Sequence, residues 1–198
     1  MDKKGIRKWY PSDVTDKQWK EIEPLYTGMR NCKWSKRELT NAVVYLVDSG
    51  CKWRQLPHDF PPYSTVHSFY RRARKRGLWE KILDHLVKKT RVNAGTKEEP
   101  SYGIIDSQSI KTVTYGDERG IDGKKTKGRK RHIVVDVLGC LISVHVHAAN
   151  VHDTKSGIVV AKQAFEKYPS IKKFCADSGY RGTFVNSIKN QIALDVDI

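Results

Sequence analysis

The hydrophobic pattern of this sequence changes once along the chain, and that change limits the folds that the chain can adopt. From Val14 to about Val92, apolar residues recur at the three- and four-residue spacings of amphipathic helices. After residue 101, short apolar runs with strand spacing come first, and helical and strand patterns then alternate. The stretch "NAGTKEEPS" between the two patterns lacks large apolar side chains and is typical of a linker. We therefore predict a small all-helical domain, a linker and a mixed-sheet α/β domain, at residues 1–93, 94–101 and 102–198.

Two helix starts in the first half are marked by capping boxes, in which a hydroxyl side chain and a residue three positions later cap each other's backbone amides. Thr15 with Gln18 forms the first box, and Ser35 with Glu38 forms the second. Gly50 is suited to end the second helix. The apolar face expected for the second helix is Leu39, Ala42, Val43 and Leu46. Ser64 is expected to cap the third helix, whose apolar face is Val66, Phe69, Tyr70 and Ala73. The apolar face expected for the fourth helix is Trp79, Ile82, Leu83, Leu86 and Val87.

The third predicted helix ends in the run "RRARKR", which places five positive charges between Arg71 and Arg76. Such crowding is destabilising unless a polyanion neutralises it. The whole chain has 37 Lys and Arg against 22 Asp and Glu, a net charge of +15 that is typical of nucleic-acid-binding proteins. A merely basic surface, or one facing anionic lipid, is the alternative. If the second and third helices form a helix-turn-helix-like unit, the third would enter the major groove of DNA. Its candidate DNA contacts are His67, Ser68, Arg71, Arg72, Arg74, Lys75 and Arg76.

The second half is expected to fold into a sheet with two helices. The predicted strands are residues 102–105, 132–137, 141–146, 173–176 and 192–196, with a turn at 138–140 and helices at 154–168 and 183–190. The longer helix should bury Ile158, Ala161 and Phe165 on one face.

Two aspartates stand out because each follows a short apolar run and precedes a serine. Asp106 lies in "GIIDSQS" and Asp177 in "FCADSG". Residues just past the carboxyl ends of strands line the functional crevice of an α/β sheet. If the two strands are neighbours, the carboxylates converge, and like charges so placed favour a divalent, oxygen-seeking ion such as Mg2+. The alternative is that each aspartate only caps a turn.

A glycine-rich basic segment, Arg119 to His132, separates the first two strands. The sequence "RGIDGKKTKGRKRH" has two interpretations. The segment is either a solvated mobile loop or, because it is expected near the carboxylates, a clamp that binds the DNA backbone. The candidate contacts are Lys124, Lys125, Lys127, Arg129, Lys130 and Arg131.

Other chemistries fit the sequence less well. His145, His147, His152 and Asp153 invite a zinc interpretation, but no matching Cys or His pair accompanies them. The four cysteines are widely separated, which indicates neither a zinc knuckle nor a disulfide framework. Ser178 lacks the context of a hydrolase nucleophile. The N-terminus has no apolar signal-peptide core and no stretch suits a membrane span, so we expect a cytoplasmic, nucleoid-associated protein.

Six blocks of the sequence resemble the bacterial insertion-sequence DDE transposases of the 4/5 group. They are "YPSDVTDKQW", "GCKWRQLPHDFPPYSTVHSFYRRARKRGLWE", "IIDSQSIKT", "GRKRHIVVDVLG", "AANVHD" and "ADSGYRG", in order from Tyr10 to Gly182. The resemblance implies an RNase H-like catalytic domain behind a helical DNA-binding domain. It also implies that Asp106 and Asp177 are the first two catalytic acids and bind Mg2+, with Mn2+ as a substitute.

The same resemblance implies a third acid that we do not find. Such transposases take a glutamate from a helix beyond the last strand, whereas this sequence stops at "IALDVDI". Glu166, Asp195 and Asp197 do not match that motif. The chain therefore resembles a C-terminally truncated transposase whose RNase H-like sheet is incomplete at its C-terminus.

Three functions follow as hypotheses. The first is a DDE transposase that binds the terminal inverted repeats of its element and target DNA as a homo-oligomer, and that cuts and joins DNA with a divalent metal. The second is a catalytically inactive fragment that acts only as a DNA-binding or inhibitory module. The third, another RNase H-like nuclease such as a junction resolvase, is disfavoured by the N-terminal blocks.

Overall fold

A computed structural model describes residues 9–30, 32–112, 118–123 and 125–198 of the chain. The chain divides into two compact units, with the boundary in the sequence between Leu83 and Asp84. This division lies inside a helix, upstream of the linker predicted at 94–101. The candidate contact Lys124 lies outside the described residues. No helix among the described residues is long and apolar enough to cross a membrane.

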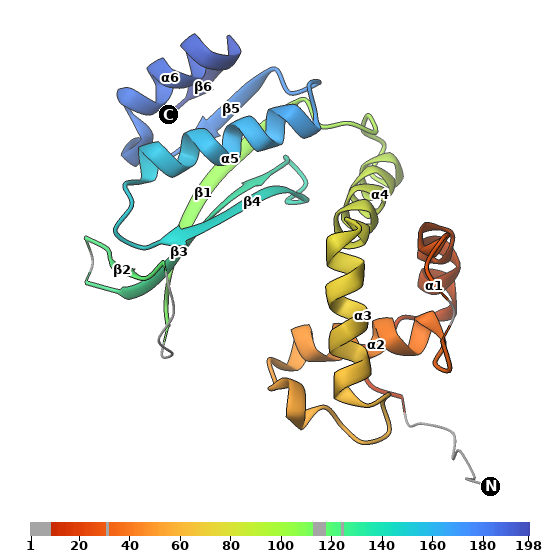
Figure 1. Ribbon diagram of the computed structural model, residues 1–198. Coiled ribbons are helices and arrows are strands. Elements are labelled where there is room, and N and C mark those ends of the chain that lie inside the picture. The colour runs from red at the N-terminus through yellow and green to blue at the C-terminus, as the bar shows by residue number, and fades with distance from the viewer. Residues whose placement is uncertain (1–8, 31, 113–117, 124) are drawn as a thin grey trace, which may run out of the picture. The chain divides into compact units, whose positions relative to one another are not determined.

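The first unit is helical, as the sequence predicted. Its elements are α1 (Asp16–Ile22), η1 (Glu23–Tyr26), α2 (Lys36–Ser49), η2 (Trp53–Gln55), α3 (Tyr63–Lys75) and the first part of α4 (Leu78–Asn93) (Figure 1). Residues 50–62, which include η2, join α2 to α3. This connection is longer than the three- or four-residue turn of a tight helix-turn-helix.

The predicted helix ends are confirmed where capping chemistry marks them. Both capping boxes, at Thr15 and at Ser35, are formed in full. Gly50 ends α2 in the left-handed conformation, with φ of 65°. The Ser64 cap is wrong, because α3 begins one residue earlier and Pro62 precedes it without a side-chain cap.

The core of this unit contains most of the predicted apolar faces. Leu39, Ala42, Val43 and Leu46 of α2 are buried together with Val66, Phe69 and Ala73 of α3. Leu86 of α4 is 42% exposed, so its predicted burial is wrong. The predicted burial of Val87 is confirmed, and Leu78, which was not predicted, is buried as well.

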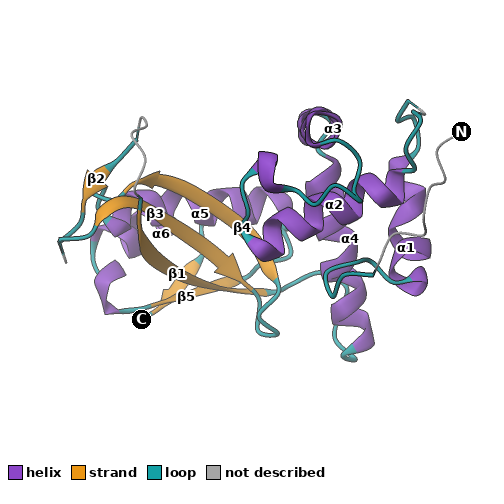
Figure 2. Cartoon of the chain, turned by 90° about the horizontal axis from the view of Figure 1, so that it is seen from below, coloured by secondary structure: helices purple, strands orange, loops and turns teal. Residues whose placement is uncertain are grey.

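The second unit is built on a six-stranded mixed sheet. Its strands are β1 (Tyr102–Lys111), β2 (Gly120–Ile121), β3 (Lys127–Val135), β4 (Leu141–Ala148), β5 (Lys173–Ala176) and β6 (Asp195–Asp197). β3 pairs antiparallel with β1, β2 and β4, while β5 lies parallel between β1 and β6. The helices α5 (Asp153–Lys167) and α6 (Thr183–Ile192) share one apolar core with the sheet (Figure 2).

Three strands extend beyond their predicted limits. β1 continues to Lys111 and β3 begins at Lys127, because these polar segments pair with each other along their whole length, up to Lys111 with Gly128. β4 likewise continues to Ala148. The apolar run alone therefore marks only the buried part of each strand. The last strand is shorter than predicted, since α6 runs through Ile192.

The buried face of α5 differs from the predicted one. Val160, Ala161 and Ala164 are fully buried, whereas Ile158 and Phe165 pack at the edge of the core. Small side chains dominate the contact because α5 lies directly on β4, β3 and β1. At Gly157, an added Cβ would come within 2.6 Å of the Tyr180 ring.

Candidate active site

The two aspartates singled out from the sequence lie on neighbouring parallel strands. β1 and β5 pair with Ile105 opposite Ala176; Asp106 is the next residue of β1, and Asp177 is the first residue after β5. Ile105 and Ala176 are both buried in the core beneath α5. Because side chains alternate along a strand, Asp106 and Asp177 emerge on the opposite face of the sheet.

The expected position of Asp106 needs a correction. Asp177 directly follows β5, as predicted, but Asp106 lies in the middle of β1. The apolar run ends at Ile105, while the strand continues because β3 supplies its hydrogen-bond partners. Asp106 shares its sheet face with Gln108, Arg131 and Ile133, which together line a pocket of about 240 Å³.

Both carboxylates are exposed, and each is held through one oxygen. Oδ1 of Asp106 accepts a hydrogen bond of 2.7 Å from the amide of Ser107. Oδ1 of Asp177 accepts one of 2.9 Å from the amide of Gly179 and so caps the short helix η3 (Ser178–Tyr180). Oδ2 of each aspartate has no hydrogen bond or ion pair with any described residue. Two exposed oxygens without a cation fit a hard divalent ion.

Within the described residues, no further acid, histidine or cysteine completes such a metal site. No group of three or more of these side chains that could hold a metal is found there. The zinc interpretation gains no support either, because His147 is hydrogen-bonded to another histidine, His132, with 2.8 Å between Nδ1 of His132 and Nε2 of His147. The described residues thus provide two neighbouring carboxylates, Asp106 and Asp177, but no complete metal site.

The basic segment 119–132, for which a mobile loop and a DNA clamp were the alternatives, is mostly strand where the structure describes it. β2 and β3 form a hairpin in which the amide of Asp122 donates to the carbonyl of Thr126, and four predicted DNA contacts lie on β3. Arg131 donates a 2.6 Å hydrogen bond to Gln108, next to Asp106 on its face. Lys130 points to the other face, where its Nζ lies 2.7 Å from Oδ1 of Asp153. Arg131 and Lys130 therefore lie on opposite faces of the sheet. The four predicted DNA contacts on β3 are Lys127, Arg129, Lys130 and Arg131.

The cations at the end of α3 are exposed on the helical unit. Arg72 and Arg76 line a pocket of about 360 Å³ whose floor includes the buried Leu39 and Phe69. Arg76 also donates a 2.7 Å hydrogen bond to the carbonyl of Gly28. His67 is half-buried and packs edge-on against Trp53, with ring centroids 4.9 Å apart. Ser68, Arg71, Arg74 and Lys75 are exposed.

Two family models match the chain in succession. Residues 14–83 match a family described as transposases of the IS4/5 family, and residues 97–193 match the transposase DDE domain. Together these matches cover most of the chain. The chain belongs to the IS4/5 family of DDE transposases. Asp106 and Asp177 of this family member lie in the second match, and the α3 cations lie in the first.

Individual relatives of the transposase chain are distant. It is 27% identical over 118 residues to the insertion element IS402 uncharacterized 16.2 kDa protein of Burkholderia cepacia, covering 54% of this chain and 78% of the relative. A solved structure, the Mos1 transposase paired-end complex with left transposon end, matches with 12% identity and a TM-score of 0.33. That match covers 85% of this chain and 60% of the Mos1 chain. The DDE-domain match and the mixed sheet confirm the predicted RNase H-like α/β fold class.

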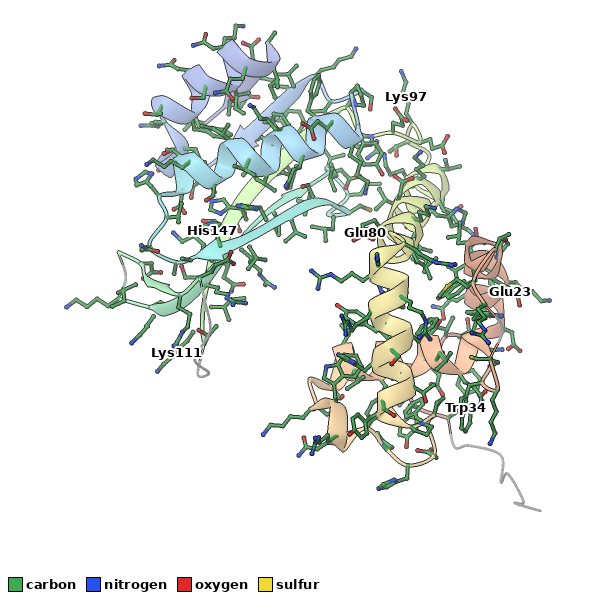
Figure 3. All side chains as sticks on the ribbon, viewed as in Figure 1. Glu23, Trp34, Glu80, Lys97, Lys111 and His147 are labelled. Carbon is green, nitrogen blue, oxygen red and sulfur yellow. The ribbon has the colours of Figure 1, made fainter. Side chains whose placement is uncertain are left out.

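Sequence reasoning missed a buried polar cluster behind the candidate site of this transposase. His132 on β3 is fully buried beneath α5, and His147 on β4 (Figure 3) packs against it with ring centroids 5.0 Å apart. Nε2 of His132 lies 3.5 Å from Oδ1 of Asp153, the first residue of α5. The signal that could have found the cluster is the strand spacing of His132 and Lys130, which places both on the core face.

This histidine cluster predicts acid sensitivity. Burial, and then the neighbouring His147, lowers the pKa of His132 to about 4, and burial also lowers the pKa of His147. The folded state thus keeps His132 neutral, while an unfolded histidine titrates near 6.5. Below that pH the unfolded chain binds more protons, so stability falls as the pH drops from about 6.5 to about 4. Lys130 opposes protonation of His132 and Asp153 favours it.

The expected loss of unfolding free energy across this interval is about 3 kcal/mol, at roughly 1.4 kcal/mol per pKa unit. Urea unfolding between pH 7.5 and pH 4 measures it. His132→Asn should flatten the pH dependence, whereas His58→Asn, at an exposed histidine of the helical unit, should leave it unchanged. An equal pH dependence in the wild type and in His132→Asn would contradict the assignment.

Proposed function

We propose that this chain is a DNA transposase that cuts and joins DNA at the ends of its own element. The observation that carries the proposal is the position of Asp106 and Asp177, one residue beyond paired positions of adjacent parallel strands and on the same open face of the sheet. The membership of the chain in the DDE transposase family supports the same assignment.

Each residue of the candidate site has a distinct role in this proposal. Asp106 and Asp177 would hold Mg2+, or Mn2+ in its place, through the oxygens that they do not share with backbone amides. The bound metal would activate the attacking water or 3′-hydroxyl and stabilise the leaving oxygen of an in-line displacement. The amides of Ser107 and Gly179 fix the two carboxylates in place before the metal arrives.

Double-stranded DNA is the proposed partner of both units. Phosphate contacts would come from the exposed cations of α3 and from the cations of β3 that share a face with Asp106, because such contacts depend on charge rather than on base sequence. Arg131 lines the same pocket as Asp106 and would position the scissile phosphate. Binding to terminal inverted repeats and to target DNA, as a homo-oligomer, belongs to the same proposal.

The test is a strand-transfer assay on labelled terminal-repeat DNA. We expect nicked and joined products with Mg2+ or Mn2+, and none with Ca2+ or after chelation by EDTA. Products that form equally well with EDTA would overturn the proposal. The flanking host DNA without the repeat serves as the control substrate.

A second candidate function is favoured by one observation, namely that among the described residues no third acid, histidine or cysteine joins Asp106 and Asp177. The chain would then occupy element ends, or form mixed oligomers with a complete transposase, without cutting DNA. Tight binding to terminal repeats without any metal-dependent product would support this inhibitory role. Restoration of products on adding a complete transposase would distinguish mixed oligomers from simple competition.

Neutralising the α3 cations should weaken DNA binding and reduce its salt dependence. In a variant with Arg71, Arg72, Arg74 and Lys75 replaced by glutamine, the slope of log affinity against log salt should decrease by up to about 3.6, at ~0.9 per phosphate contact. Fluorescence anisotropy at salt concentrations from about 50 to about 300 mM measures this slope.

The matched control removes the same charge elsewhere on the surface, through Lys17→Gln, Lys20→Gln, Lys81→Gln and Lys172→Gln. All four lysines are exposed. Equal slopes for the two quadruple variants would show that only net charge matters and that α3 has no special contact with DNA.

A further inference from the structure

Another pocket of the helical unit lies at the start of α3, at the opposite end of that helix from the basic run. Its volume is about 300 Å³, and it is lined by the connection between α2 and α3 together with Trp34, which is labelled in Figure 3. The lining includes Leu56 and Phe60, two buried residues of the core of this unit. The pocket is therefore apolar where it meets the core.

The wall of this pocket is rigid before anything binds. Three prolines, Pro57, Pro61 and Pro62, contribute to it, and a proline ring fixes the backbone angle φ. The Phe60 ring packs against two tyrosines, Tyr10 and Tyr45, with ring centroids 5.1 and 5.3 Å away. A ligand thus meets a preformed surface, which lowers the conformational entropy that binding costs.

Two basic side chains, Arg54 and His58, line the same pocket and are exposed. Within the described part of the chain, neither side chain has an ion pair or a hydrogen bond. The guanidinium of Arg54 instead lies over the Tyr63 ring, 6.0 Å from its centroid. The N–H groups of Arg54 are therefore available to an anionic ligand at the pocket.

Tyr63 connects this pocket to the basic end of α3. It lines the pocket, is the first residue of α3 and is 42% exposed. Arg74 lies eleven residues further along the helix, close to three full turns, so the two side chains share one face of α3 at a spacing of ~16 Å. That spacing corresponds to roughly five base pairs of DNA. A DNA molecule bound to Arg74 can thus also reach the pocket.

The pocket suits the face of a nucleobase better than the other parts of DNA. In a duplex, a protein reaches the polar edges of the bases through the grooves. A phosphate requires positive charge and gains nothing from an apolar wall. An unpaired base, by contrast, stacks its ring on an aromatic side chain, and its phosphate then lies beside the cations of the same surface. The exposed Tyr63 ring, the apolar wall and the guanidinium of Arg54 match these needs.

We propose that this pocket holds one unpaired nucleotide of the bound DNA. The base stacks on the Tyr63 ring inside the apolar wall, and Arg54 and His58 bind its phosphate. The helical unit then prefers DNA that offers an unpaired base, such as an opened or bulged duplex. This inference rests on the proposed binding of DNA by α3. It goes further, because phosphate contacts alone carry no preference for an unpaired base.

The test compares three end-labelled duplexes of otherwise equal sequence. One is fully paired, one carries a single bulged thymidine, and one carries an abasic nucleotide in place of that thymidine. We expect the wild type to bind the thymidine bulge about 10-fold more tightly than the paired duplex, within the range that stacking of one base provides. The abasic bulge should bind like the paired duplex, since it keeps the flexible joint and lacks the base. Fluorescence anisotropy measures all three affinities.

Variants at the pocket locate the effect. Tyr63→Leu should abolish the preference for the thymidine bulge and leave affinity for the paired duplex unchanged, whereas Tyr63→Phe should keep the preference because the ring remains. Arg54→Gln should lower the salt slope on the bulged duplex by about 0.7 to 0.9, the value of one phosphate contact. The matched control is Trp9→Leu. Trp9 is 65% exposed and has Arg37 over its ring at 5.9 Å, but it is not among the residues that line this pocket, so its loss should not change the preference.

The possible failures are distinguishable. Equal affinity of the wild type for the paired duplex and the thymidine bulge would overturn the inference and leave the proposed DNA binding intact. Equal binding of the two bulges would overturn it as well, because the protein then recognises the joint and not the base. So would a preference that survives Tyr63→Leu, or a Tyr63→Leu variant that changes only the molar mass in light scattering, which would assign the pocket to a second copy of the chain. Failure to bind any duplex at low salt would overturn the proposed function and this inference together.

Discussion

Asp106→Asn and Asp177→Asn should each reduce metal-dependent strand transfer by more than about 100-fold, the upper range seen on losing groups that merely support metal ligands. Asparagine keeps the size of the side chain and one oxygen, so the hydrogen bonds from Ser107 and Gly179 can persist. It removes the negative charge, and with it most of the attraction for a divalent ion. Product formation at saturating DNA, measured over a range of Mn2+ concentrations, quantifies the loss.

A third aspartate of the same sheet provides the matched control. Asp195 on β6 is exposed and pairs with Lys189, 2.5 Å away, instead of facing the candidate site. Asp195→Asn should leave strand transfer unchanged. Circular dichroism and unfolding of all three variants would establish that the sheet is intact. Wild-type activity in either Asp106→Asn or Asp177→Asn would remove these residues from the proposed chemistry.

Asp136→Asn should destabilise the second unit by about 3–5 kcal/mol, the usual cost of removing one partner of a buried ion pair. Asp136 and Arg91 are both buried, and Nη1 of Arg91 lies 2.5 Å from Oδ2 of Asp136. The other oxygen of Asp136 accepts the amides of Leu138 and Cys140 in the β3–β4 turn. The pair thus joins the last turn of α4 to that turn, and its loss leaves a buried guanidinium without a counter-charge.

Chemical unfolding followed by far-ultraviolet circular dichroism and by tyrosine fluorescence measures this effect, because all five tryptophans lie in the first unit. Lys189→Gln, which removes one partner of the exposed pair with Asp195, is the control and should have no measurable effect. A loss of less than about 1 kcal/mol in Asp136→Asn would show that the buried pair contributes no more than a surface one.

The helix ends were predictable because the interactions that set them are local. Thr15 with Gln18, Ser35 with Glu38 and the left-handed Gly50 all act within one helical turn, and the structure confirms each. The predicted cap at Ser64 is wrong. α3 begins at Tyr63, directly after Pro62, so Ser64 lies inside the helix and not at its N-cap. The strand at Lys173–Ala176 was located correctly because its apolar run coincides with its buried length.

The second unit departs from prediction wherever a distant partner decides the structure. Asp106 was expected at a strand end, yet β1 runs on through polar residues because β3 pairs with it. The basic segment before His132 was expected to be a loop, and the same pairing makes much of it a strand. The burial of His132, and that of the Arg91–Asp136 ion pair, was not predicted. In each case the polar partner that makes burial possible lies far away in the sequence.

The sequence by itself determined the helical and mixed α/β halves, the caps, the basic character and the two aspartates that matter most. Those features follow from side-chain chemistry and spacing, which act over a few residues. Only the tertiary structure decided that Asp106 on β1 and Asp177 directly after β5 come side by side, that Lys130 and Arg131 lie on opposite faces, and that His132 is buried beneath α5. Strand order and register depend on the packing of the whole sheet against α5 and α6, which no local pattern encodes.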